Sequence, residues 1–169
     1  MFRHAQITDA DCYLGDDDLV GVVKSFQIPS LEMATVDHET LGMVAVFQAP
    51  ARPLQVMEAE IEFQAIDADL ARLVLNPTKA LAFQLHQKVD VFGPDGLDTD
   101  RSHRLVTHVR LLFKAHEFGA STLGELQGHT ATASCIYLRQ RASNQNTSIV
   151  EIDIFNQRHK VNGEDVWPR

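Results

Sequence analysis

Three carboxylates, Glu58, Glu60 and Glu62, alternate with apolar residues in the segment 57–64, and Gln64 occupies the next position of the same series. The positions between them are apolar, so the segment predicts a strand that buries one face and carries a row of carboxylates on the other. Like charges at this spacing repel one another unless water, cations or a basic neighbour screens them. The row is therefore a plain solvated sheet face, a surface that pairs with basic residues of a neighbour, or the wall of a channel.

A basic complement to this row lies farther along the chain, at alternate positions of the segment 104–116. If the segment is a regular strand, these residues share one face. We expect them to pair with carboxylates of the same chain or of a neighbouring copy. They are Arg104, His108, Arg110, Lys114 and His116.

The eight histidines raise the question of catalysis or metal binding, because imidazole is a frequent general base and metal ligand. His103 and His108 would lie on opposite faces of a strand, and the other histidines are scattered along the chain. The sequence contains no nucleophile elbow, phosphate-binding glycine loop, Cys-x-x-Cys pair or His-Glu-x-x-His motif. We therefore predict that the protein is not an enzyme and holds no cofactor or metal. A small β-barrel enzyme or binding domain stays as a distant alternative, favoured by the histidine count.

Composition limits the class of protein further. The chain has 169 residues, 44% of them hydrophobic, which is enough for one domain over 1–169 with a sizeable core. No apolar run approaches the length of a membrane span, so we expect a soluble protein without a membrane anchor. The net charge of −8 argues against tight binding of nucleic acid phosphates. Cys12 and Cys135 are too few for a disulfide framework, and we expect two free thiols.

Alternating and apolar segments bounded by turn residues predict strands at 19–28, 55–63, 80–91, 105–115, 130–139 and 150–155. Asp67 can cap a helix over Ala68–Leu75, which Asn76-Pro77 would end. Turns are expected at 16–18, at 93–100 and at Asn162-Gly163. The fold class predicted is mainly β, a β-sandwich or partly closed barrel with one flanking helix.

The segment 41–54 is unusually apolar for a region that Gly42, Pro50 and Pro53 should keep irregular. As an internal strand it would belong to the core. As a protrusion it would form a hydrophobic patch that assembly could bury. The residues that would take part are Met43, Val44, Val46, Phe47, Pro50, Pro53 and Leu54.

The C-terminal region carries the most specific pattern: Val150-Glu-Ile-Asp153, then Asn156, then Lys160-Val-Asn-Gly163. This string closely resembles the C-terminal signature of the major tail tube proteins of contractile-tailed bacteriophages. The segment Gly21–Leu31 and the pairs Gly42-Met43 and Ala49-Pro50 also resemble that family in order and spacing. The resemblance covers most of the chain in outline.

By this resemblance, the chain is expected to form the inner tail tube, with hexameric rings stacked around a channel for genome ejection into the host. The apolar residues of 41–54 would form the subunit interface, and Glu58, Glu60 and Glu62 would face the lumen. The implied partners are copies of itself, the sheath, tape-measure, baseplate and terminator proteins, and double-stranded DNA that passes without specific binding. The implied location is the virion tail, after assembly in the host cytoplasm. A tube of a tailocin-like particle or of a secretion-system injection apparatus is the near alternative.

Overall fold

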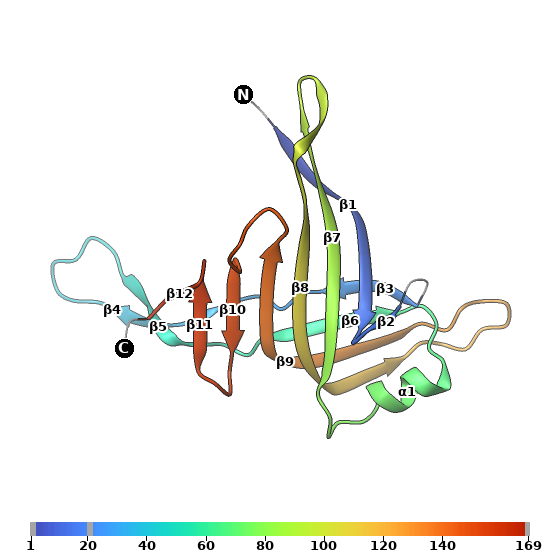
Figure 1. Ribbon diagram of the computed structural model, residues 1–169. Coiled ribbons are helices and arrows are strands. Elements are labelled where there is room, and N and C mark those ends of the chain that lie inside the picture. Colours follow the sequence, from blue (N-terminus) through green and yellow to red (C-terminus); the bar gives the residue numbers. More distant parts are fainter. Residues whose placement is uncertain (1–2, 20–21, 168–169) are drawn as a thin grey trace.

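The computed structural model describes residues 3–19 and 22–167, and strands dominate that part of the chain (Figure 1). Its single helix, α1, spans Ala68–Val74. The strands in chain order are β1 (His4–Leu14), β2 (Asp17–Asp18), β3 (Val23–Gln27), β4 (Met33–His38), β5 (Phe47–Leu54), β6 (Glu58–Phe63), β7 (Leu81–Gly93), β8 (Gly96–Phe118), β9 (His129–Ala142), β10 (Val150–Asp153), β11 (Arg158–Val161) and β12 (Glu164–Asp165).

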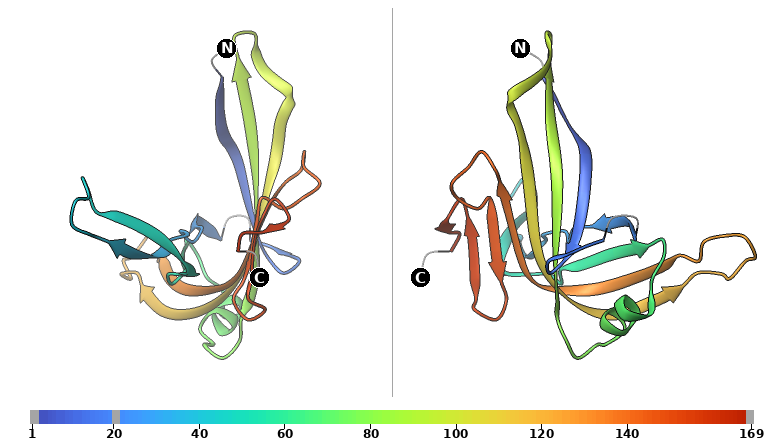
Figure 2. Two further views of the ribbon diagram at one scale, coloured as in Figure 1. Left: turned by 90° about the vertical axis from the view of Figure 1, so that its left-hand side faces the viewer. Right: turned by 45° about the vertical axis from the view of Figure 1, so that its right-hand side comes forward.

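One ten-stranded sheet, folded over on itself, contains all strands except β4 and β5. Its main path runs β12-β11-β10-β9-β8-β7-β1-β2, and we call this the first layer. The second layer has four strands, β3, β6 and the distal parts of β9 and β8, in which β6 pairs with both β3 and β9. Figures 1 and 2 show β8 and β9 leaving the upright first layer and curving into the second. The sheet remains open, so the predicted mainly β fold is confirmed in a form that does not close into a barrel.

The curvature of β8 coincides with two irregularities in its pairing to β9. The register shifts between Arg110 and Leu111 and again between Phe113 and Ala115. A β-bulge adds a residue to one strand, bends it and increases its twist. These shifts allow the same two strands to serve both layers.

The core lies between the two layers. The first layer contributes residues such as Phe83, Leu111 and Ile152, and the second contributes Ile61 and Phe63, all at most 2% exposed. The predicted alternation in β6 is confirmed, because Met57, Ala59, Ile61 and Phe63 are buried. At about 25 cal/mol per Å² of buried apolar area, such side chains each contribute roughly 1.5–3 kcal/mol to folding.

The helix follows its sequence signals closely. The Asp67 Oδ1 atom accepts a hydrogen bond from the Leu70 backbone N–H at 2.7 Å, as expected of an N-cap residue. Leu70 and Val74 are buried and anchor the helix. The predicted helix is therefore confirmed to within one residue at its C-terminal end.

The N-terminal strand β1 has no counterpart among the predicted strands. It pairs with β7 over nearly its whole length, and the two strands stand with β8 as an upright blade in Figure 1. Residues 4–10 are exposed on both faces, so they lack the apolar alternation by which a half-buried strand is recognised.

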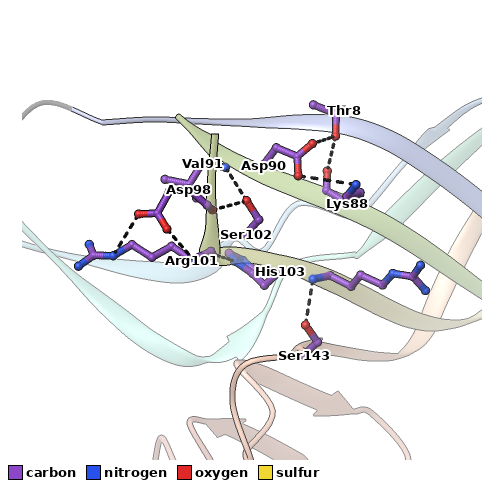
Figure 3. A network of polar contacts seen from close by, with 10 residues as sticks. Thr8, Lys88, Asp90, Val91, Asp98, Arg101, Ser102, His103 and Ser143 are labelled. Atoms are coloured by element: carbon purple, nitrogen blue, oxygen red, sulfur yellow. Dashed lines mark hydrogen bonds and ion pairs between the residues drawn. The ribbon is translucent and has the colours of Figure 1, made fainter. Parts of the chain in front are cut away.

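The three strands of the blade bulge at the same height. Shifts lie at Thr8 in β1 and at Asp90 in β7, where the Thr8 hydroxyl donates to Asp90 Oδ2 at 2.6 Å. On β8, the Ser102 hydroxyl donates to the Asp98 carbonyl at 2.7 Å and accepts from the Val91 N–H at 3.2 Å (Figure 3). The two Ser102 bonds satisfy backbone groups that the interrupted ladder leaves unpaired, and together with the Thr8–Asp90 bond they stabilise the bulged region.

Other predicted elements need smaller corrections. The strand predicted over 19–28 is shortened to β3, and residues 20–21 of that segment lie outside the described residues. The turn predicted at 93–100 is confined to the connection between Gly93 and Gly96, a cross-strand pair. Residues 97–100 already belong to β8.

The C-terminal segment forms three short strands, β10, β11 and β12. Turns with positive φ occur at Gln157 and at Asn162-Gly163, the second of which was predicted. Ile152 is buried and Val150 packs against the core, whereas Ile154 lies beyond the strand and is exposed. The strand predicted over 150–155 therefore ends two residues early, because the chain turns after Asp153.

Candidate assembly surfaces

The apolar segment 41–54 forms the tip and the second strand, β5, of a protruding β-hairpin. Strands β4 and β5 pair only with each other among the described strands and extend away from both layers (Figures 1 and 2). The tip is solvent-exposed: the relative accessible surface is 104% for Val44, 52% for Val46 and 58% for Phe47. Met43, Pro50 and Pro53 are exposed as well.

The base of the hairpin is fixed to the body. Leu54 is half-buried and packs against the core, which separates it from the other predicted interface residues. The Arg52 guanidinium lies over the ring of Trp167, 5.8 Å from its centroid. The hairpin therefore has an anchored root and a hydrophobic tip that nothing in the described chain covers.

The carboxylate row lies on the outer face of the second layer, away from the core. Lys24 on β3 forms an ion pair with Glu62 at 2.8 Å, and Lys114 on β8 forms one with Glu58. The hydrogen bond from Lys24 lowers the pKa of Glu62. Glu60 is exposed and has no ion pair among the described residues. One further carboxylate, Glu117 on β8, belongs to this face, because Thr130 on β9 is the cross-strand partner of both Glu62 and Glu117.

The predicted basic complement is divided between the two layers. Lys114 pairs with Glu58 as expected. Arg104, His108 and Arg110 lie on the outer face of the first layer, because the residues between them, such as Thr107 and Val109, are buried. The second register shift between β8 and β9, where Lys114 is the extra residue on β8, turns His116 to the inner face, opposite buried Ala131. The prediction that His116 shares a face with Lys114 is therefore wrong.

The inward turn of His116 creates a pair of histidines that the sequence did not reveal. His116 Nδ1 lies 3.1 Å from His129 Nε2, and aromatic rings of Phe63, Phe113 and Phe118 surround the two imidazoles. Burial lowers the pKa of both rings, and the neighbouring His116 lowers the pKa of His129 further. The two histidines are thirteen positions apart, on the two strands of a hairpin, so no local sequence pattern indicated that they would meet.

A second hydrophobic protrusion lies at the β8–β9 loop, at the opposite side of the molecule from the β4–β5 hairpin in Figure 1. Phe118, Leu123 and Leu126 are exposed there, and Leu123 is fully so. The sequence offered one sign of this exposed apolar loop, namely two leucines within the glycine-containing segment 119–128. The molecule thus presents uncovered apolar tips on two sides.

Several sheet edges are unpaired within the described residues. β2 covers only the last two residues of β1, and β3 has a neighbour on one side alone. The distal part of β8, beyond Leu111, has β9 on one side and no strand on the other. Such edges can accept strands of another chain.

The described residues hold no group of three or more His, Cys, Asp or Glu side chains placed to bind a metal ion. Cys12 and Cys135 are buried free thiols, as predicted. The described helix is too short to cross a membrane.

Comparison with solved structures supports the fold. A chain of the PVC sheath-tube complex, an extracellular contractile injection system in the extended state, aligns with a TM-score of 0.54 and 11% identity, over 81% of this chain and 90% of that chain. A chain of the PVC sheath/tube terminator, also in the extended state, aligns with a TM-score of 0.55 and 10% identity, over 80% of this chain and 95% of that chain. No curated protein shows a significant match.

Comparison with protein families assigns the chain to one family. The model of phage tail tube protein FII matches residues 4–168, which is nearly the whole chain. The match includes the blade, both layers, the protruding hairpin and the C-terminal signature. The chain therefore belongs to the family of phage tail tube protein FII, a family of structural proteins.

Proposed function

We propose that the chain forms the inner tube of a contractile tail, as hexameric rings stacked around a channel through which the genome leaves the particle. The observation that carries the proposal is the combination of family membership with unpaired sheet edges and two uncovered apolar tips in one subunit. A monomer that exposes such edges and tips is incomplete, and self-association buries them.

Ring closure would use the sheet edges. The second layer ends at β3 on one side and at the distal part of β8 on the other. Pairing of these edges between neighbouring copies would join the second layers into a continuous wall. A closed ring leaves no edge for uncontrolled addition of strands.

The number of strands in each layer supports the proposal that the second layer lines the channel. Neighbouring strands are spaced by about 4.7–4.9 Å, so a layer with fewer strands fits the smaller, inner circumference. The second layer has four strands, whereas the path of the first has eight. The outer face of the second layer, with Glu58, Glu60 and Glu62, would then face the lumen. Carboxylates there would repel DNA phosphates and let the duplex slide without binding.

Ring-to-ring contacts would use the apolar tips. We assign Met43, Val44, Val46, Phe47, Pro50 and Pro53 on the hairpin to this contact, with Leu54 at its root. A head-to-tail contact of this kind is heterologous and propagates indefinitely, so tube length must be set by other proteins. A tape-measure protein, a baseplate component as nucleus and a terminator are the partners required, with a sheath outside the tube.

An injection apparatus with a protein cargo is the second candidate. The observation that favours it is the similarity to chains of the PVC sheath-tube complex and terminator. The same wall would serve either cargo. Recovery of DNA or of protein from isolated, sheathed particles separates the two functions.

Negative-stain microscopy and light scattering of the purified protein test the proposal. Tubes or rings of uniform diameter are expected, and their amount should increase with protein concentration. A protein that remains monomeric at high concentration over a range of salt, and also in the presence of its baseplate partner as nucleus, would contradict the tube function.

A further inference from the structure

The outer face of the first layer carries arginines on neighbouring strands. Arg110 lies on β8 and Arg139 on β9, and His108 is the direct cross-strand partner of Arg139. Arg104 and Arg141 continue the same face along the two strands. This cluster, which we call the arginine stripe, stands out in a chain with a net charge of −8.

The arginines of the stripe lack carboxylate partners. The ion pairs among the described residues join other groups, and none involves Arg104, Arg110, Arg139 or Arg141. Arg139 Nε instead donates to the Ser148 hydroxyl at 2.8 Å. Glu151 is the cross-strand partner of both Arg139 and Lys160, yet it makes no ion pair with either within 4.0 Å.

A shallow hollow of about 210 Å³ lies within the stripe. Gln84, His108, Arg110, Tyr137 and Arg139 provide its polar lining. Arg110 and Arg139 are diagonal cross-strand neighbours, and like charges at this spacing repel each other unless an anion lies between them. Burial lowers the pKa of His108, and the charge of Arg139 lowers it further, which agrees with a positive potential in the hollow.

The flanking strands restrict what can bind. Asp9 and Asp11 lie on β1 at one side of the stripe, and Glu151 and Asp153 lie on β10 at the other. A broad acidic surface would meet these carboxylates and be repelled. A segment one strand or one helix wide can place its acidic side chains over the stripe alone.

We propose that the hollow between Arg110 and Arg139 receives a carboxylate side chain from an acidic segment of a partner protein. The arginines donate charge-assisted hydrogen bonds to that carboxylate, which relieves their mutual repulsion. Because the second layer faces the lumen in the proposed tube, the stripe faces outward, and the partner is a chain that surrounds the tube. The outward location rests on the proposed function, whereas the binding of a carboxylate does not.

The test measures binding of a fluorescent synthetic peptide of alternating Glu and Thr to the full-length protein by fluorescence anisotropy. The double variant Arg110→Gln/Arg139→Gln should weaken binding about tenfold or more, since two charge-assisted hydrogen bonds are lost. The matched control Arg72→Gln/Lys79→Gln removes the same charge at two exposed positions outside the stripe and should retain binding. Added salt should weaken binding by the wild type.

Three outcomes would overturn the inference. They are absence of peptide binding at low salt, an equal loss in both double variants, and tighter binding of double-stranded DNA than of the peptide, which would make the stripe a nucleic-acid surface. Microscopy of the same proteins keeps the two proposals separate. A wild type that binds the peptide but never forms tubes contradicts the tube function and the outward location that rests on it, and leaves the carboxylate site standing. Loss of tubes in the Arg110→Gln/Arg139→Gln variant would overturn the outward location, because it would place the stripe between subunits.

Discussion

The Nδ1 atom of His116 lies 3.1 Å from the Nε2 atom of His129, inside a cluster of phenylalanine rings at the base of the β8–β9 loop. One N–H···N hydrogen bond joins the two rings when both are neutral. Two imidazolium rings at this distance would direct like charges and two donors at each other. The contact is therefore compatible with neutral rings and is lost when both are protonated.

Acid should destabilise the protein through this pair. Burial lowers the pKa of both rings below the ordinary value of 6.5, so between the folded-state values and 6.5 the folded protein binds fewer protons than the unfolded chain. The free energy of unfolding should be highest above pH 6.5 and should decrease as the pH falls from 6.5 through the folded-state pKa values. Urea denaturation between about pH 7.5 and about pH 5 measures this slope.

The variant His116→Gln should reduce the slope, because one titrating ring and the repulsion between two charged rings are removed. The exposed His38 on the hairpin provides the control variant His38→Gln. Part of the slope should remain, since the pKa of His108 is lowered as well. An unchanged slope in His116→Gln would show that the pair does not govern the acid response. The charged side chains of the neighbouring strands, Lys114, Glu117 and Glu62, lie on the opposite face of the sheet.

The two thiols should be unreactive in the folded protein. Burial raises the pKa of Cys12 to about 12, with an added effect of Asp18, and raises the pKa of Cys135 to about 11. Because the thiolate is the nucleophile, alkylation by iodoacetamide at about pH 8 should be slow when folded and complete in urea. Mass spectrometry measures it, with Ser121→Cys in the exposed β8–β9 loop as a reactive reference. Alkylation of the native thiols at the rate of that reference would contradict their burial.

The hairpin tip should control assembly and leave folding intact. Replacing Val46 and Phe47 by Ser removes apolar area worth roughly 1.5–3 kcal/mol per side chain when fully buried at a contact, and the loss recurs at every subunit. Sedimentation should show monomers, and the circular dichroism spectrum should be unchanged because the monomers stay folded. The control Leu73→Ser alters an exposed leucine on α1 and should still form tubes. Unfolding of the double variant would instead show that the tip contributes to the stability of the monomer.

Reversing the charge of Glu60 should affect cargo transport more than assembly. Glu58 and Glu62 are paired with lysines, so Glu60 is the member of the row whose charge is least compensated within the described chain. Glu60→Lys would place a ring of cations in the proposed lumen, where each releases counterions from DNA and holds it. Tubes should form normally while genome delivery slows, and added salt should weaken DNA retention.

The variant Asp69→Lys on α1 controls for charge reversal outside the lumen. Asp69 is exposed and takes part in an ion pair with Arg72 at the helix surface. Normal infectivity of particles with Glu60→Lys tubes would show that Glu60 does not face the lumen. Loss of tubes in that variant would place Glu60 at a subunit contact.

Local patterns were sufficient for elements whose stability depends on one buried face or one terminal signal. The alternation at 57–63 predicted both the strand β6 and its buried side, because a period of two leaves no other arrangement that hides Ile61 and Phe63. Asp67 and Asn76-Pro77 bounded the helix, since capping and chain termination act within a few residues. The C-terminal signature indicated the family, because its residues follow one another closely in the chain and can be recognised without their tertiary contacts.

Tertiary structure alone decided the features that depend on bulges and on pairing between distant segments. Strand β1 is exposed on both faces over residues 4–10 and owes its conformation to hydrogen bonds with β7, about eighty residues away in the chain. The bulge beyond Phe113 turned His116 inward, against the alternation of its own sequence, and brought it to His129. A one-residue shift exchanges the faces of every side chain that follows, and no local pattern shows where it occurs. The sequence by itself therefore determined the fold class, the family and the buried face of β6, whereas the path of the folded sheet decided which polar side chains meet.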